Sequence, residues 1–144
     1  MTAATPSCEL CQDSGGEELY RDHQLRVVLV DDAQYPGFCR VIWHTHVKEM
    51  TDLAPTERSA MMQMVMKVEA ALRESMNPDK INLASLGNMT PHLHWHVIPR
   101  FADDAHFPSP VWAGAQRTTD AATLASRAAQ LDALRAALAR QTAQ

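Results

Sequence analysis

The residues best suited to chemistry lie in one short run, His-Leu-His-Trp-His-Val-Ile at positions 92–98. A β-strand has a side-chain period of two, so we expect His92, His94 and His96 on one face. The intervening apolar residues would then face a core. Three imidazoles on one strand add little to stability, because apolar side chains would pack better and need no partners. The run therefore indicates a reaction centre or, alternatively, a buried or metal-holding histidine cluster.

The chemistry open to these side chains is of two kinds. A neutral imidazole is a competent nucleophile towards phosphorus, and a phosphohistidine would split one difficult displacement into two easier ones. A neighbouring imidazolium could stabilise phosphate charge and protonate the leaving group. Three histidines can equally hold a catalytic zinc, as in a metallohydrolase, so the spacing alone leaves both alternatives open.

The bulk composition indicates a single globular domain. The chain has 144 residues, of which 46% are hydrophobic, and a formal net charge of −4 without a basic block, which argues against binding to a nucleic-acid backbone. No apolar run approaches the roughly 20 residues of a membrane span. The first residues lack the pattern of a signal peptide, so we expect a cytoplasmic protein.

The elements that position the histidines can be predicted from local patterns. Runs rich in β-branched residues predict strands at 25–30 and 38–43, joined as an antiparallel pair. A short strand at 19–21 and a strand at 80–86 complete the candidates before the histidine run. Between them a long helix begins at Pro55, with an apolar stripe at helical spacing: Met61, Val65, Val68 and Leu72.

The two ends of the chain are less regular. Residues 1–18 are expected to form an N-terminal loop carrying Cys8 and Cys11, and residues 101–112 are loop-like. The alanine-rich stretch 118–140 predicts a C-terminal amphipathic helix. Together these features predict one α+β domain spanning residues 1–144.

The run at 92–98 resembles the signature of the histidine triad (HIT) superfamily, His-φ-His-φ-His-φ-φ, where φ is apolar. Segments 25–53, 80–88 and 99–101 resemble the strands around that signature. The resemblance implies a five-stranded antiparallel sheet with a long helix after the second main strand, usually in a homodimer. It also implies hydrolysis or transfer at the α-phosphate of a nucleotide, without an organic cofactor.

The same resemblance assigns roles to the histidines. His94 would be the nucleophile that forms a nucleotidyl intermediate, His96 would contact the phosphate and the leaving group, and His92 would orient the others or bind metal. Dinucleoside polyphosphates and nucleoside phosphoramidates are the implied substrates. A nucleotide-binding module with little or no catalysis is the alternative.

Resemblance also suggests residues that contact the phosphate. Asn82 lies near the position of a phosphate-binding amide in the family, and Asn88 stands where many members carry glutamine. The hydroxyl that usually precedes the triad aligns with Met89, which leaves Thr90 as its substitute. Phe38 occupies a position where members often carry histidine.

The ribose-binding acid of the family aligns with Val30, so Asp31 or Asp32 could serve only after a one-residue shift. Trp95 and the segment 107–112 resemble a bacterial subgroup close to dinucleoside tetraphosphate hydrolases. The differences from the family at Phe38, Met89 and Val30 do not change the expected reaction type, but they leave the substrate open.

A Cys-x-x-Cys pair near the N-terminus suggests a metal site, because this spacing lets two thiolates reach one zinc. No βαβ pattern surrounds the pair, which disfavours a redox motif. By resemblance, the pair would bind a structural zinc together with a histidine after the second strand and the first triad histidine: Cys8, Cys11, His46 and His92. Cys39 is expected in the core, His44 outside the ligand set, and His23 and His106 in solvent.

Overall fold

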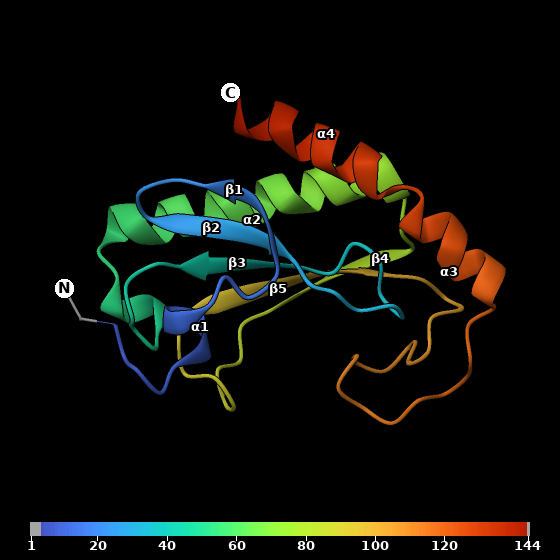
Figure 1. Ribbon diagram of the computed structural model, residues 1–144, viewed down its shortest axis with the longest axis horizontal. Coiled ribbons are helices and arrows are strands. Elements are labelled where there is room, and N and C mark those ends of the chain that lie inside the picture. The colour runs from blue at the N-terminus through green and yellow to red at the C-terminus, as the bar shows by residue number, and fades with distance from the viewer. Residues whose placement is uncertain (1–3, 144) are drawn as a thin grey trace.

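The computed structural model describes residues 4–143, in which five antiparallel strands form one sheet in the order β1-β2-β3-β5-β4 (Figure 1). The strands are β1 (Glu17–Arg21), β2 (Leu25–Leu29), β3 (Cys39–Trp43), β4 (Lys80–Ala84) and β5 (His94–Arg100). The helices are α1 (Glu9–Gln12), α2 (Pro55–Met76), α3 (Ala121–Ala128) and α4 (Leu131–Thr142), with a 3₁₀ turn at Met50–Asp52. This confirms the predicted α+β fold with a five-stranded antiparallel sheet.

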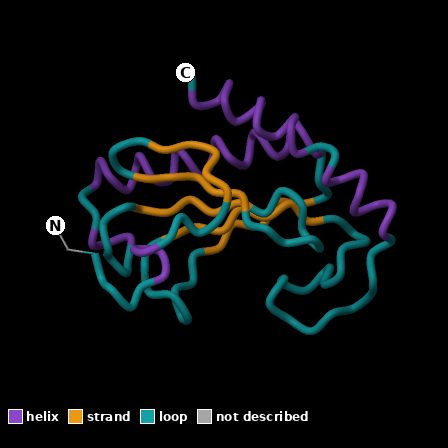
Figure 2. The backbone as a smooth tube through the Cα atoms, viewed as in Figure 1, coloured by secondary structure: helices purple, strands orange, loops and turns teal. Residues whose placement is uncertain are grey.

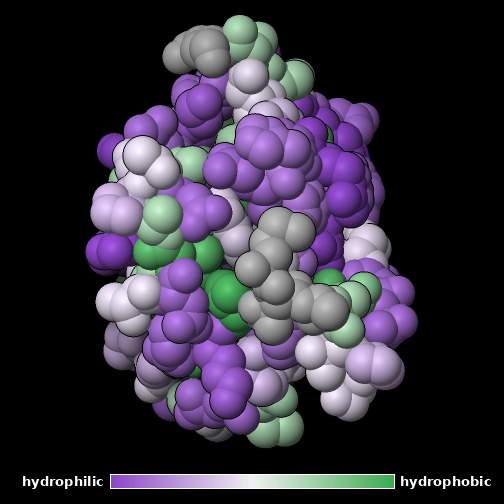
Figure 3. Space-filling model, turned by 90° about the vertical axis from the view of Figure 1, so that its left-hand side faces the viewer, coloured by the Kyte–Doolittle hydropathy of each residue, from purple (hydrophilic) through white to green (hydrophobic). Residues whose placement is uncertain are grey.

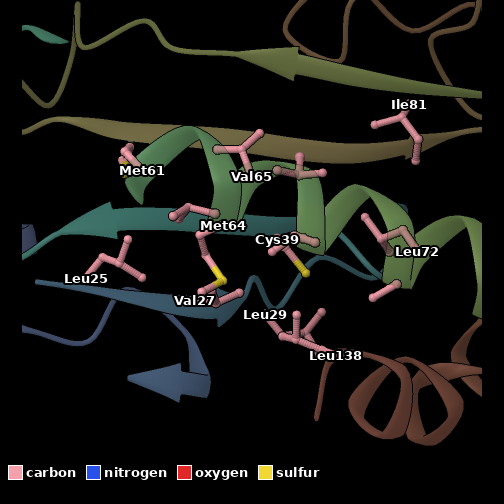
Figure 4. Packing of buried hydrophobic residues seen from close by; sticks show 14 of the residues in the cluster. Leu25, Val27, Leu29, Cys39, Met61, Met64, Val65, Leu72, Ile81 and Leu138 are labelled. Carbon is pink, nitrogen blue, oxygen red and sulfur yellow. The ribbon is translucent and has the colours of Figure 1, made fainter. Parts of the chain in front are cut away.

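One face of the sheet packs on α2, and α4 lies against α2 in turn. Strand alternation sends every second apolar side chain to this face, where each buried large aliphatic residue contributes roughly 1.5–3 kcal/mol. Figure 4 shows part of this core, with side chains from β2, β3, β4, α2 and α4: Leu25, Val27, Leu29, Cys39, Ile81, Met61, Met64, Val65, Leu72 and Leu138. The predicted stripe of α2 is therefore its core face.

Helix α2 begins and ends where local chemistry requires. Pro55 occupies the first turn, where its missing N–H costs nothing, and the Glu57 carboxylate accepts a hydrogen bond from the Ala54 N–H. Asn77 adopts a left-handed conformation (φ +46°) and its N–H donates to the Arg73 carbonyl. Residues at the two ends of α2 therefore determine where the helix begins and where it stops.

The single C-terminal helix predicted over 118–140 is in fact two helices, α3 and α4, and this prediction was wrong in its continuity. The chain tightens at 129–130, where the Gln130 N–H donates to the Arg127 carbonyl three residues back. The bend lets α4 follow α2 and bury Leu134 and Leu138, whereas α3 buries none of its residues. The burial of α4 against the core therefore explains why the chain bends between α3 and α4.

The N-terminal segment is more regular than the loop predicted over 1–18. A one-turn helix, α1, begins directly after Cys8 and contains Cys11, and β1 already begins at Glu17. Cys8 and Leu10 pack on Val28 and Ile42, on the sheet face opposite α2. The N-terminal segment thus covers one end of that face.

The opposite end of the same face is covered by the segment between β5 and α3, which Figure 2 shows as continuous loop. Tyr35, Phe38 and Ile98 form a small apolar cluster beneath it. Hydrophobic residues occupy only a small area of the face seen in Figure 3, which is mainly hydrophilic. No helix within the described residues is long and apolar enough to cross a membrane.

Candidate active site

The strand that carries the histidines begins later than predicted. β5 starts at His94, and His92 lies in the bend before it, where its N–H donates to the Thr90 carbonyl. The expectation that His92 belongs to the same strand was therefore wrong, although Leu93 after it packs into the core, as predicted. His94 and His96 do share a face, with ring centroids 4.8 Å apart.

His94 has a defined proton arrangement. Its Nδ1 lies 2.6 Å from the His92 carbonyl oxygen, which can only accept, so Nδ1 carries the hydrogen and Nε2 keeps its lone pair. Burial lowers the pKa of His94 below its ordinary value of 6.5; the bond to His92 opposes this shift, and the positive charge of Arg40 adds to it. The ring is therefore neutral near pH 7, as a nucleophile requires.

His96 is the most strongly perturbed histidine. Burial lowers its pKa to about 3, helped by the charges of His94 and Arg40. Its ring meets the rings of Trp112 and Phe38 edge-on, at centroid distances of 5.0 and 5.7 Å. Its Nδ1 is buried and finds no hydrogen-bond partner within residues 4–143, and Phe38 beside it has no polar atom to offer.

These histidines line a cavity of about 330 Å³, which we call the histidine cavity. Its other walls come from β3, from the loop before β5 and from the loop after it: Arg40, Leu86, Gly87, Asn88, Met89, Thr90 and Trp112. The predicted contacts Asn88 and Thr90 therefore lie beside His94. Three exposed apolar side chains, those of Leu86, Met89 and Trp112, surround it.

A second group of side chains could hold a metal ion. Ligand atoms of the Cys/His cluster, defined as Cys8, Cys11, His46 and His92, all lie within 4.8 Å of one another. Burial raises the pKa of the Cys8 thiol; the main-chain N–H of Cys11 opposes this shift, and the Cys11 side chain adds to it. All four residues selected from the sequence meet at this point.

His92 is oriented towards that cluster rather than towards the histidine cavity. Its Nε2 donates to the Trp43 carbonyl at 2.6 Å, which leaves Nδ1 as the free ligand atom. That Nδ1 lies 3.4 Å from the Cys8 sulfur and 3.2 Å from Nδ1 of His46. Because the ring nitrogens of His92 and the Nδ1 of His94 are directed elsewhere, the arrangement does not favour a metal shared by the three triad histidines.

A buried ion pair anchors the loop beyond β5. Arg100 and Asp104 are each at most 2% exposed and are joined by two hydrogen bonds of 2.8 and 3.0 Å. Asp104 also accepts a hydrogen bond from Tyr35, whose hydroxyl contacts His106. The expectation that His106 is exposed and unpartnered was wrong, because the folded loop brings it onto Tyr35.

Asn82 lies on the histidine side of the sheet, since β4 pairs with β5 and places Asn82 opposite Ile98. Its side-chain carbonyl accepts a hydrogen bond of 2.7 Å from Arg100. Asn82 is not among the residues that line the histidine cavity. Its predicted phosphate contact stays a prediction.

Asp31 and Asp32 line a different cavity, of about 630 Å³, between the β2–β3 loop and the C-terminal helices. The structure therefore does not bring them together with His94 and His96. Val30, the residue before them, packs on the apolar cluster that contains Phe38. A ribose contact from either aspartate stays a prediction.

The remaining expectations concern single residues. Cys39 is fully buried in the core, as predicted, and burial raises its pKa to about 12. His44 lies outside the Cys/His cluster and contacts the Asp22 carbonyl at 2.9 Å. His23 is exposed, as expected.

Sequence reasoning missed two residues of this site. Arg40 lies opposite His96 in the β3–β5 pairing and lines the histidine cavity. Its signal was a single charged residue inside an otherwise apolar strand. Asp104 organises the loop that carries Trp112, but one aspartate in a loop with several polar residues gives no signal of burial.

Comparison with known proteins agrees with this geometry. The family model for the HIT domain matches residues 14–103, and the chain belongs to this family. Histidine triad structures from Bradyrhizobium japonicum (29% identity, TM-score 0.70) and Marinobacter aquaeolei VT8 (25% identity, TM-score 0.71) are similar throughout. The matches cover 89% of this chain and 91% of the first structure, and 94% and 99% for the second.

Two further relatives are informative. A curated Mycobacterium tuberculosis protein named AP-4-A phosphorylase is 29% identical over 112 residues, or 72% of this chain. This chain spans only 57% of that relative's length. A zinc-bound histidine triad protein from Mycobacterium smegmatis has the same fold, with a TM-score of 0.66, 24% identity and coverage of 95% and 96%. The sequence match and the shared fold together assign this chain to the HIT family.

Proposed function

We propose that this protein is a nucleotide hydrolase or nucleotidyl transferase acting at the α-phosphate of a dinucleoside polyphosphate or a nucleoside phosphoramidate. The observation that carries the proposal is the hydrogen bond from Nδ1 of His94 to the His92 carbonyl, which leaves a neutral ring with a free Nε2 in a cavity. HIT membership and the relative named AP-4-A phosphorylase support the choice of substrate.

The proposed reaction has two displacements at phosphorus. The Nε2 lone pair of His94 attacks the α-phosphorus, a P–N bond forms, and the leaving group departs with the electron pair of its bond to phosphorus. The oxygen of water then attacks the same phosphorus, and the P–N electron pair returns to Nε2. The net reaction adds one water and yields a nucleoside monophosphate and a protonated leaving group.

His96 is the proposed proton donor to the leaving group. Its low pKa means that the free enzyme holds it neutral near pH 7. A bound phosphate anion would raise that pKa, because a nearby negative charge favours the imidazolium. Trp112 and Phe38 flank the ring and limit its contact with water.

Side chains around the cavity are the proposed substrate contacts. Asn88 and Thr90 line it, and the Thr90 hydroxyl donates to the Glu9 carboxylate at 3.0 Å. Asn82 would contribute its amide from β4. Asp31 and Asp32 stay candidates for the ribose, at the far side of the β2–β3 loop.

The Cys/His cluster is proposed to bind one zinc ion. Tetrahedral zinc holds nitrogen and sulfur ligands roughly 3.3–3.6 Å apart, given its usual bond lengths. Four of the six ligand pairs within the cluster lie 3.2 to 3.5 Å apart, and all lie within 4.8 Å. Zinc would cross-link the N-terminal segment to the bend at His92 and so fix the main chain that accepts the His94 hydrogen bond.

A homodimer is part of the proposal, as family resemblance implies. Strand β4 lies at the edge of the sheet, and Met66 on α2 is 43% exposed. An open strand edge and an exposed apolar side chain are features that a second copy could cover. Sedimentation equilibrium of the purified protein would give the oligomeric state.

The decisive experiment measures nucleotide release from diadenosine tetraphosphate and from adenosine phosphoramidate by the wild type and by His94→Ala. We expect turnover of at least one substrate by the wild type and a fall of at least roughly 10⁴-fold in the variant, which retains nucleotide affinity. Adding inorganic phosphate separates two fates of the intermediate. Attack by water yields AMP, whereas attack by phosphate yields ADP.

Three outcomes would change the conclusion. Binding of nucleotide without cleavage of either substrate would favour the alternative, a nucleotide-binding module. Turnover that survives in His94→Ala would overturn the role of His94. Formation of ADP in phosphate would make the protein a phosphorylase with the same nucleophile.

A further inference from the structure

Arg40 is the second residue of β3, and the pairing with β5 places it opposite His96. Directly paired residues of antiparallel strands project to the same face, with Cβ atoms roughly 4.5–5.5 Å apart. The guanidinium therefore lies on the histidine face of the sheet, and it lines the histidine cavity beside His94 and His96.

Two further arginines of this face, both buried, are held by hydrogen bonds within the protein. Arg26 donates to three main-chain carbonyls of the N-terminal segment, at 2.9–3.0 Å. Arg100 is bound by the Asp104 carboxylate, by Asn82 and by the Ser109 carbonyl. Both therefore have structural roles that account for their burial.

Arg40 differs from them. Its Nε is buried and has no hydrogen-bond partner, and none of the hydrogen bonds or ion pairs among residues 4–143 involves its guanidinium. Arg40 as a whole is half-buried, but a buried guanidinium nitrogen without a partner is costly, so such a group indicates an anion that is bound in the working state.

The nearest acidic side chains do not fill this role. Glu9 and Asp13 line a smaller cavity, of about 230 Å³, on the other side of Arg40. The charge of Glu9 acts on Arg40 at a distance, but the carboxylate of Glu9 is hydrogen-bonded by Thr90 and forms no ion pair with the guanidinium. The side of Arg40 that faces His94 stays open.

We propose that Arg40 binds a second phosphate of the substrate, next to the one attacked by His94, and so selects substrates whose leaving group is a phosphate chain. This inference rests on the proposed function and narrows its substrate class. A guanidinium binds phosphate oxygens through two parallel hydrogen bonds, which suits a polyphosphate. The leaving group of a phosphoramidate is an amine, which offers Arg40 no negative charge.

The test compares two substrates in wild type, Arg40→Gln and Arg40→Lys, with Arg73→Gln as the matched control. Arg73 lies on the exposed side of α2, so its variant makes the same change in net charge away from the site. We expect Arg40→Gln to lower kcat/KM for diadenosine tetraphosphate roughly 10- to 100-fold, the usual effect of losing a charged hydrogen bond. The phosphoramidate should change less than about threefold, and Arg40→Lys should recover part of the loss.

A binding measurement separates this inference from the proposed function. ADP and AMP are titrated into the wild type and Arg40→Gln by calorimetry, without any need for turnover. A preference for ADP that disappears in Arg40→Gln supports the phosphate contact, even if neither substrate is cleaved and the proposed function fails. An equal loss for both substrates, or an unchanged preference for ADP, would overturn the role of Arg40 whether or not His94 is catalytic.

Discussion

The Nδ1 of His94 lies 2.6 Å from the carbonyl oxygen of His92, so that the first triad residue fixes the tautomer of the second through its main chain. His92 itself is held by the Trp43 carbonyl and directed at the Cys/His cluster. The cluster and the histidine cavity are therefore connected through one peptide unit.

The protonation of His94 predicts the acidic limb of the pH profile. Burial lowers its pKa below 6.5, so the neutral nucleophile persists as the pH falls through 6.5 and is lost only at lower pH. We expect kcat/KM to stay level from about pH 8 to 6.5 and to decline below that. Steady-state kinetics across this range checks it, and a decline that begins above pH 7 would contradict the low pKa.

His96 predicts a pH-dependent loss of stability. Its pKa is about 3 in the folded protein and near 6.5 when unfolded, so between these values the unfolded chain binds the extra proton. The free energy of unfolding should fall by up to about 1.4 kcal/mol per pH unit as the pH drops below 6.5. Urea unfolding at pH 7 and pH 5 measures it, and His96→Gln should show a smaller difference than wild type.

Replacing the buried carboxylate of Asp104 should strongly lower the free energy of unfolding. Burial alone would raise the pKa of Asp104, but hydrogen bonds from Arg100 and from main-chain N–H groups hold it well below its usual range. Asp104→Asn leaves the buried Arg100 charge unpaired and should cost roughly 3–5 kcal/mol. The exposed pair of Glu74 and Arg140 provides the control, since Glu74→Gln should cost less than about 1 kcal/mol in the same urea titration.

Much of the fold could be predicted from local patterns. The strand pair, the helix that starts at Pro55 and the core position of Cys39 follow from side-chain periodicity, which acts over a few residues. The break at residues 129–130 could not be predicted, because it depends on how α4 packs against α2. The displacement of His92 from the strand also depends on distant residues, those of the Cys/His cluster.

The site residues also fall into those that the local sequence predicts and those that depend on tertiary structure. The spacing of the motif was enough to predict that His94 and His96 are neighbours, since strand alternation alone places them on one face. Arg40 became evident only when the pairing of β3 with β5 was known. The burial of Asp104 depends on a long loop folding back onto Tyr35, and no periodic signal encodes that.

Trp112 predicts an optical signal for ligand binding. It is 52% exposed and lies over His96, whereas Trp43 is only 3% exposed and Trp95 packs towards the core. Titration with AMP should therefore change the tryptophan emission, and Trp112→Phe should abolish that change. Trp95→Phe is the control that retains it; the prediction fails if the two variants behave in the opposite way.

The Cys/His cluster predicts the effect of metal removal. Cys8→Ser should lower the zinc content of the purified protein to near zero, because each structural site needs all of its four ligands. We expect a clear fall in the midpoint of thermal unfolding, since the N-terminal segment loses its cross-link to His46 and His92. Cys39→Ala is the matched control, because Cys39 lies in the core outside the cluster and its loss should leave the zinc content unchanged.

Activity then separates a structural role from a catalytic one. If zinc only holds the bend at His92, Cys8→Ser should retain turnover at temperatures where it is still folded, although kcat falls as the His92 carbonyl becomes less well placed for His94. Circular dichroism establishes the folded range, and assays are confined to it. Complete loss of turnover in the folded variant would instead give the metal a direct part in the reaction.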